Sequence, residues 1–179
     1  MLHDKWVVRW REYAADTYTY GSQIEFCEDH TVLFKNRLMP PGTVIHKWYS
    51  QTNFQIQRIE PALPLIDGER AYSITLHIDS NNADSDALML RIIFYDRYDK
   101  EADSMIVRDK RAFFKPSIKT YSYCVELING GNADFRFHSF EIKEVSKEEF
   151  DEEQKRIAGL KEDSDKDKKK WRKHKKSER

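Results

Sequence analysis

The sequence has few of the residues that mark specialised classes of protein. Its 179 residues include only two cysteines, five prolines and six glycines, so they support neither a disulfide framework nor a glycine-rich phosphate-binding loop. No run approaches the roughly 20 apolar residues that span a bilayer, and no signal peptide is recognisable. These absences predict a cytoplasmic protein in which Cys27 and Cys124 are free thiols rather than a disulfide.

An excess charge of one sign is also missing. Lys and Arg together number 31, as do Asp and Glu, which gives a formal net charge of zero. A folded domain that binds nucleic acid needs a basic face, and here the basic residues are in excess only from residue 147 onward. We therefore expect no nucleic acid among the ligands of this protein.

Catalytic and metal-binding motifs are equally scarce. The six histidines show no spacing with Cys, Asp or Glu that is typical of a metal site. His46 near Ser50 is the one local pair of a base and a nucleophile, and no nucleophile-elbow motif surrounds it. The sequence thus predicts no metal, no cofactor and no enzymatic activity.

Alternation of apolar and polar residues is the dominant pattern up to residue 145. Residues 72–79, 88–95 and 121–128 each alternate over a full strand length, with turn residues between them. Shorter candidate strands are residues 6–10, 24–26, 32–34, 44–48, 105–107, 112–114 and 135–142. The pattern predicts an all-β fold, an antiparallel β-sandwich of eight or nine strands over residues 1–145.

The last predicted strand changes its apolar face partway along. The apolar side chains follow one parity up to Phe137 and the other parity from Phe140. A β-bulge near His138 produces such a shift. We expect this strand to pair with residues 121–128 through a hairpin at the Asn-Gly-Gly-Asn sequence.

A helix is predicted after the last strand, at residues 146–161. Ser146 and Glu149 form a capping box at its start. Three apolar residues share one face, which either packs on the sandwich or binds a protein partner: Phe150, Ile157 and Leu160. Residues 162–179 have almost nothing to bury, so we expect a charged, disordered tail.

The tail contains a basic run at residues 168–176, with Trp171 inside it. Such a run is usually only a solvated end of the chain. The alternative is a weak contact with anionic lipid at the inner face of the membrane, with RNA or with an acidic partner, in which Trp171 acts as an anchor.

Two aromatic and polar stretches, residues 37–55 and 16–22, are the candidate ligand-binding regions. The candidate residues are Trp48, Tyr49, Asn53, Phe54, Gln55, Tyr18 and Tyr20. Exposed rings beside amide groups are typical of a surface that binds a sugar or an extended peptide. The alternative is that Trp48 lies in the core and that Tyr18 and Tyr20 pack at strand edges.

Several of these stretches resemble one known family. The most specific is residues 39–55, Met-Pro-Pro-Gly-Thr-Val-Ile-His-Lys-Trp-Tyr-Ser-Gln-Thr-Asn-Phe-Gln. It is supported by residues 20–22, 94–97 and 121–142. Together they resemble the smallest of the three accessory secretory proteins of the Gram-positive accessory Sec system. The resemblance covers most of the region before residue 145 and excludes the tail.

This resemblance implies a function. Members of the family are non-enzymatic partners of the two larger accessory secretory proteins, and work in the cytosol with the accessory motor ATPase to export serine-rich-repeat glycoprotein adhesins. The family is similar in fold to carbohydrate-binding modules, which implies a jelly-roll-like sandwich. The alternatives are a stand-alone sugar-binding module and a β-sandwich hydrolase.

Overall fold

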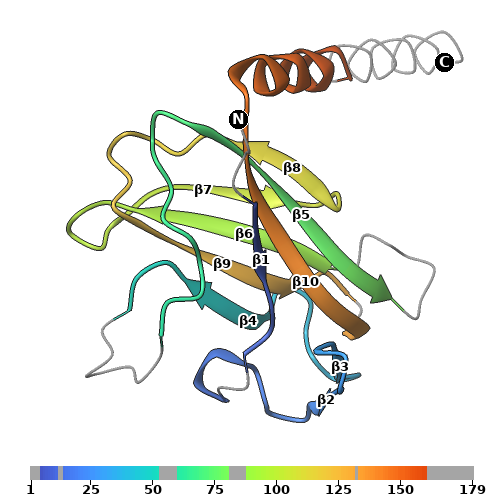
Figure 1. Cartoon of the computed structure of the whole chain (residues 1–179). Coiled ribbons are helices and arrows are strands. Elements are labelled where there is room, and N and C mark those ends of the chain that lie inside the picture. Colours follow the sequence, from blue (N-terminus) through green and yellow to red (C-terminus); the bar gives the residue numbers. More distant parts are fainter. Residues whose placement is uncertain (1–4, 12–13, 53–59, 81–87, 132, 161–179) are drawn as a thin grey trace, which may run out of the picture.

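The computed structural model contains two antiparallel sheets packed face to face, with a helix at the C-terminal end (Figure 1). The described residues are 5–11, 14–52, 60–80, 88–131 and 133–160. Successive side chains of a strand point to opposite faces, so each sheet buries one face against the other. The predicted antiparallel β-sandwich is confirmed, and the predicted tail at residues 162–179 lies outside the described residues.

The six-stranded sheet is organised around its longest strand, β10. The order of its main path is β2 (Gln23–Phe26), β3 (Val32–Lys35), β10 (Asp134–Val145), β5 (Ala71–Ser80) and β8 (Arg111–Phe114). The sixth strand, β1 (Lys5–Val8), pairs with the second half of β10, on the side where β3 pairs with the first half. One strand therefore aligns three others.

The second sheet has four strands. Their order is β4 (Val44–Tyr49), β9 (Ser122–Asn129), β6 (Leu88–Tyr95) and β7 (Glu101–Val107). A short segment after the 3-10 helix η1 (Ala14–Asp16) lies along β4, where Thr17 forms a bridge with His46. The Tyr18 N–H also donates to the Ile45 carbonyl oxygen at 2.8 Å. This segment covers the β4 edge and leaves β7 at the opposite edge.

The predicted strands and the bulge are found in the structure. Every predicted strand segment contributes to a strand, and the described residues form ten strands. This is more than the eight or nine expected, because β1 and β3 are separate strands that share one side of β10. The register between β10 and β5 shifts between Phe137 and Ser139, which confirms the bulge and lets both Phe137 and Phe140 face the core.

The predicted hairpin between residues 121–128 and the last strand is wrong. β9 pairs with β4 on one side and with β6 on the other, so both of its edges are occupied within its own sheet. The residues after β9 cross to the other sheet: Asn129 Nδ2 donates to the Met39 carbonyl oxygen at 3.0 Å, and Gly131 has a φ of 138°. The turn sequence therefore marks a crossover between sheets.

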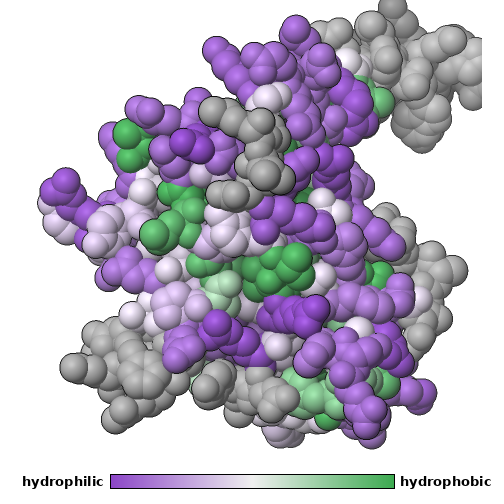
Figure 2. Space-filling view, in the orientation of Figure 1, coloured by the Kyte–Doolittle hydropathy of each residue, from purple (hydrophilic) through white to green (hydrophobic). Residues whose placement is uncertain are grey.

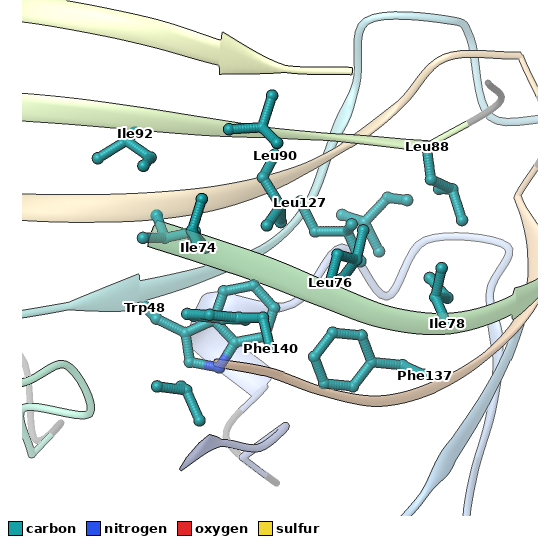
Figure 3. Close-up of a cluster of buried hydrophobic side chains, with 14 of the residues drawn as sticks. Trp48, Ile74, Leu76, Ile78, Leu88, Leu90, Ile92, Leu127, Phe137 and Phe140 are labelled. Carbon is teal, nitrogen blue, oxygen red and sulfur yellow. The ribbon is translucent and has the colours of Figure 1, made fainter. Parts of the chain in front are cut away.

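The core between the sheets is rich in aromatic rings, and Figure 3 shows Trp48 beside Phe140 and Phe137. Trp48 is 1% exposed, and its ring centroid lies 4.9 Å from Phe140 and 5.5 Å from Phe137. Its indole N–H donates to the Arg9 carbonyl oxygen at 2.9 Å. The predicted place of Trp48 on a ligand-binding surface is therefore wrong, because β4 turns this side chain into the core.

The C-terminal helix occupies residues 147–160 of the described chain and stands over the end of the sandwich formed by β7 and β8 (Figure 1). Its capping box is present: the Glu149 N–H donates to Ser146 Oγ at 3.1 Å. Arg111 of β8 forms an ion pair with Glu149 at 3.2 Å. Among the described residues, no helix combines the length and apolar character needed to cross a membrane.

The face that carries β1 and β10 is largely hydrophilic, with small apolar patches between the polar side chains (Figure 2). Ion pairs cross this face: Lys5 Nζ lies 2.7 Å from Glu141 Oε1, and His138 Nε2 lies 2.7 Å from Asp79 Oδ2. All four side chains are partly exposed, so these pairs add little stability. We look for binding surfaces elsewhere on the molecule.

The burial of Trp48 leads to a stability prediction. The substitution Trp48→Ala should lower the free energy of unfolding by about 3–5 kcal/mol, because it removes a packed indole from the core. Urea denaturation followed by circular dichroism measures the change. Tyr20→Ala is the control, since Tyr20 is 84% exposed, and it should change stability by no more than about 0.5 kcal/mol. Equal effects of the two substitutions would contradict the assigned core.

Candidate binding surfaces

A row of alternating charges crosses the outer face of the four-stranded sheet. Lys47 of β4, Glu126 of β9 and Arg91 of β6 are register partners on adjacent strands. Lys47 Nζ lies 2.8 Å from Glu126 Oε1, and Arg91 Nε donates to Glu126 Oε2 at 2.8 Å. The Glu126 side chain is 2% exposed, whereas those of Lys47 and Arg91 are 40% and 39% exposed. Each carboxylate oxygen thus has a cation, and both cations also reach solvent.

Asp16 extends this row beyond β4. It is buried, and burial raises the pKa of its carboxyl group, while the charges of Arg11 and Lys47 act in the opposite direction. Burial lowers the pKa of Lys47, but the hydrogen bond and charge of Glu126 outweigh it and leave the pKa raised. The row therefore alternates in sign from Asp16 through Lys47 and Glu126 to Arg91. We call these four residues the charged row.

Two tyrosines lie beside the charged row. Tyr49 of β4 is the register partner of Cys124, and the Tyr95 hydroxyl lies 3.5 Å from Cys124 Sγ. Cys124 and its other partner, Ile93, are buried, whereas both tyrosines are half-buried. The surface therefore has an apolar floor with phenol rings and cationic groups at its sides, a mixture that suits hydroxyl-rich or amide-rich ligands.

The cysteines offer no nucleophile at this surface. Cys27 and Cys124 are both free thiols, as predicted. Burial raises the pKa of the Cys124 thiol, with the Tyr95 hydrogen bond as a weaker opposing cause. Because the thiolate is the reactive form, this thiol is inert near neutral pH.

The other predicted residues of the ligand-binding regions are spread over different environments. Tyr49 lies on the outer face of the sheet, Tyr18 packs against the core, and Tyr20 is exposed. Asn53, Phe54 and Gln55 lie outside the described residues. Sequence reasoning did not select Arg91, Glu126 or Tyr95. A single acidic residue within the apolar run of residues 121–128 is the signal that points to Glu126.

A second surface lies beside the C-terminal helix. A groove of about 880 Å³ runs between the helix and the neighbouring parts of β7 and β8. Its apolar residues include Ile106, Phe113, Ile157 and Leu160, and its charged residues include Arg108, Asp109, Arg111, Glu153 and Arg156. Two of the three predicted partner-binding residues, Ile157 and Leu160, thus share one groove. The third, Phe150, lines a separate pocket with Arg70 and Glu144.

His46 and Ser50 have structural roles. The His46 ring is buried, stacks on Trp10 with centroids 4.5 Å apart, and places Nδ1 2.6 Å from Thr17 Oγ1. Ser50 Oγ accepts a hydrogen bond from the Tyr123 N–H at 2.8 Å. Within the described residues, no group of three or more His, Cys, Asp or Glu side chains is arranged to hold a metal ion.

These features define the class of protein: a two-layer β-sandwich with one candidate binding surface on a sheet face and another beside its helix. A family model described as Accessory Sec secretory system ASP3 matches residues 17–144. The chain belongs to this family and is thus a component of the accessory Sec system. The matched region ends before the C-terminal helix begins.

Relatives with known names or structures agree with this family. The accessory Sec system protein of the same ASP3 name from Streptococcus gordonii is 38% identical over 132 residues, which cover 74% of this chain and 82% of that protein. A chain of the Glycosylation Associate Protein (Gap123) complex from Streptococcus agalactiae has a TM-score of 0.74 at 31% identity, over 80% of this chain. This chain spans only 45% of that relative.

A further solved structure contains accessory secretory proteins 1, 2 and 3 of Streptococcus pneumoniae. Its matching chain has a TM-score of 0.73 at 29% identity. The match covers 78% of this chain and 96% of that chain, so nearly the whole relative corresponds to part of the present protein.

The charged row leads to a second stability prediction. Glu126→Gln should lower the free energy of unfolding by about 1–3 kcal/mol, because it removes the carboxylate that separates Lys47 from Arg91. The partial exposure of both cations keeps the loss below that of a fully buried pair. Glu25→Gln, at an exposed position on β2, is the matched control and should have almost no effect. Urea denaturation at low and high salt compares the two, and equal losses would contradict the role given to Glu126.

The buried His46 leads to a prediction on pH. Burial lowers the pKa of His46 from 6.5 to about 3, so the unfolded chain takes up a proton at this residue before the folded protein does. Stability from neutral His46 is complete above pH 6.5 and is lost as the pH falls toward 3. The stability advantage of wild type over His46→Gln should narrow by about 2 kcal/mol between about pH 7.5 and about pH 5. A constant difference across that range would contradict a buried, neutral His46.

Proposed function

We propose that this protein is a non-enzymatic binding subunit that joins the two larger accessory secretory proteins and takes part in the export of serine-rich-repeat glycoprotein adhesins. The observation that carries the proposal is the structural match to a chain of the Streptococcus pneumoniae structure of accessory secretory proteins 1, 2 and 3. The Streptococcus agalactiae relative also comes from a complex. The fold that matches these chains carries two surfaces suited to binding.

The outer face of the four-stranded sheet is the proposed surface for the adhesin. The rings of Tyr49 and Tyr95 offer flat apolar area, and Lys47 and Arg91 offer hydrogen-bond donors to hydroxyl and carbonyl groups. A repetitive, glycosylated chain presents such groups many times along its length. Weak contacts repeated along one chain give useful avidity without a deep pocket.

The groove beside the C-terminal helix is the proposed surface for a larger accessory secretory protein. Leu160 is 58% exposed and Ile106 is 50% exposed, and both line this groove. Large exposed apolar side chains that share one concave surface are typical of a protein-binding site. The groove and the sheet face carry different chemistry, which suits two different partners.

Two further contacts belong to this proposal. The accessory motor ATPase is the expected source of energy for export, and the protein works in the cytoplasm at the inner face of the membrane. The basic run at residues 168–176 is the proposed weak contact with anionic lipid or with the motor, because Lys and Arg are attracted to a negative surface.

A stand-alone carbohydrate-binding module is the second candidate function. Tyr49 and Tyr95 on either side of an apolar floor favour it, since sugar rings stack on aromatic side chains while their hydroxyl groups bond to polar neighbours. This function needs no accessory secretory partner.

Gentle affinity purification from the native host separates the two functions. A tagged copy of this chain should recover both larger accessory secretory proteins in stoichiometric amounts, and an identically tagged unrelated β-sandwich should recover neither. Quantitative mass spectrometry of the eluates measures the ratios. Recovery of this chain alone, together with binding to a defined saccharide on a glycan array, would replace the export function with the stand-alone module.

A further inference from the structure

The free edge of β7 is unlike the other sheet edges. The segment around Thr17 covers β4, and the edge strands β2 and β8 have four residues each. β7 has seven residues, and its first four are exposed. Within the described residues, no strand pairs with its outer side. A long exposed edge presents backbone groups to which another extended chain can add.

The register shows which backbone groups β7 directs outward. The Ser50 N–H donates to the Tyr123 carbonyl oxygen at 3.0 Å, so the peptide groups of Tyr123 and every second residue along β9 face β4. Glu126 has the opposite parity and faces its partner Arg91 in β6. Arg91 therefore directs its peptide groups away from β7, and its β7 partner, Ile106, directs its own N–H and C=O to the free edge.

Ser104 lies two residues before Ile106 and has the same orientation. The register between β6 and β7 is regular at both positions, because its one irregularity lies nearer the start of β7. The Ser104 N–H donates to the neighbouring Asp103 Oδ1 at 2.8 Å, a local contact that an added strand would replace. Two residues with outward N–H and C=O groups allow such a strand to form two hydrogen-bonded pairs. Ser104 is also small, so it leaves room for a neighbouring chain.

The groove beside the helix continues from this edge. Ile106 lines the groove and belongs to the free edge, and Ile157 and Leu160 line the groove from the helix side. Side chains of a strand added to β7 would reach these apolar residues. The edge also has opposite charges at its two ends, with Glu101 and Asp103 at one end and Arg108 at the other.

We propose that the free edge of β7 binds an extended strand of a protein partner, with aliphatic side chains in the groove and a carboxylate beside Arg108. The inference rests on the proposed function only for the identity of the partner, which is one of the two larger accessory secretory proteins. The backbone pairing with Ser104 and Ile106 provides affinity. The apolar groove and the opposite charges of the two ends select the sequence and the direction of the strand.

The test compares two substitutions at Ser104 in the full chain, co-expressed with both larger accessory secretory proteins. Ser104→Pro removes the outward N–H but keeps the hydrogen bonds to β6, since proline is tolerated where an edge N–H faces solvent. It should weaken assembly by about tenfold or more, because it removes one bond of the added strand and places a ring against it. Ser104→Thr keeps the N–H and should assemble within about twofold of wild type.

Hydrogen exchange of the wild-type protein provides a measurement that needs no variant. The Ile106 amide should exchange at least about tenfold more slowly in the assembled complex than in the free chain, because the added strand accepts its hydrogen bond only in the complex. A thermal unfolding midpoint of Ser104→Pro equal to that of wild type shows that the variant folds.

The outcomes separate this inference from the proposed function. Assembly of Ser104→Pro at wild-type strength, with unchanged exchange at Ile106, would overturn edge pairing and leave the proposed function intact. Failure of the wild-type chain to bind either larger protein would overturn both. Protection of Ile106 by a second copy of this chain, without any partner, would show self-association and would also overturn the inference.

Discussion

The bulge in β10 is the constraint on which the rest of the structure depends. β10 pairs with β1, β3 and β5, and the extra residue at His138 keeps apolar side chains on the core face along both halves of the strand. Without this residue, one half of β10 would direct its apolar side chains to solvent. Phe140 would then lose its contact with Trp48, and the two sheets would no longer share one core.

This core frees the outer face and one edge of the four-stranded sheet for binding. Trp48 and His46 of β4 point inward, so Lys47 and Tyr49 point outward beside Glu126. The charged row fixes these side chains without closing the surface. The free edge of β7 and the helix groove lie at the far side of the same sheet, so two partners can bind this sheet at once.

The sequence predicts local features well because alternation and parity are local. The positions of the strands, the bulge near His138 and the capping box at Ser146 all follow from neighbouring residues, and the structure confirms them. The pairing of β9 was mispredicted, because an Asn-Gly-Gly turn suits a crossover as well as a hairpin. The ion pairs of Glu126 depend on which strands are neighbours, and the groove depends on where the helix lies. Alternation alone specifies neither.

Native mass spectrometry of a reconstituted assembly is the most direct test of a subunit with two binding surfaces. The sample would contain this chain, the two larger accessory secretory proteins and a glycosylated serine-rich adhesin segment. We expect one assembly that holds all four components, because the sheet face and the edge groove are separate. Loss of the accessory secretory proteins whenever the adhesin binds would contradict this arrangement, since it would show that both partners compete for one surface.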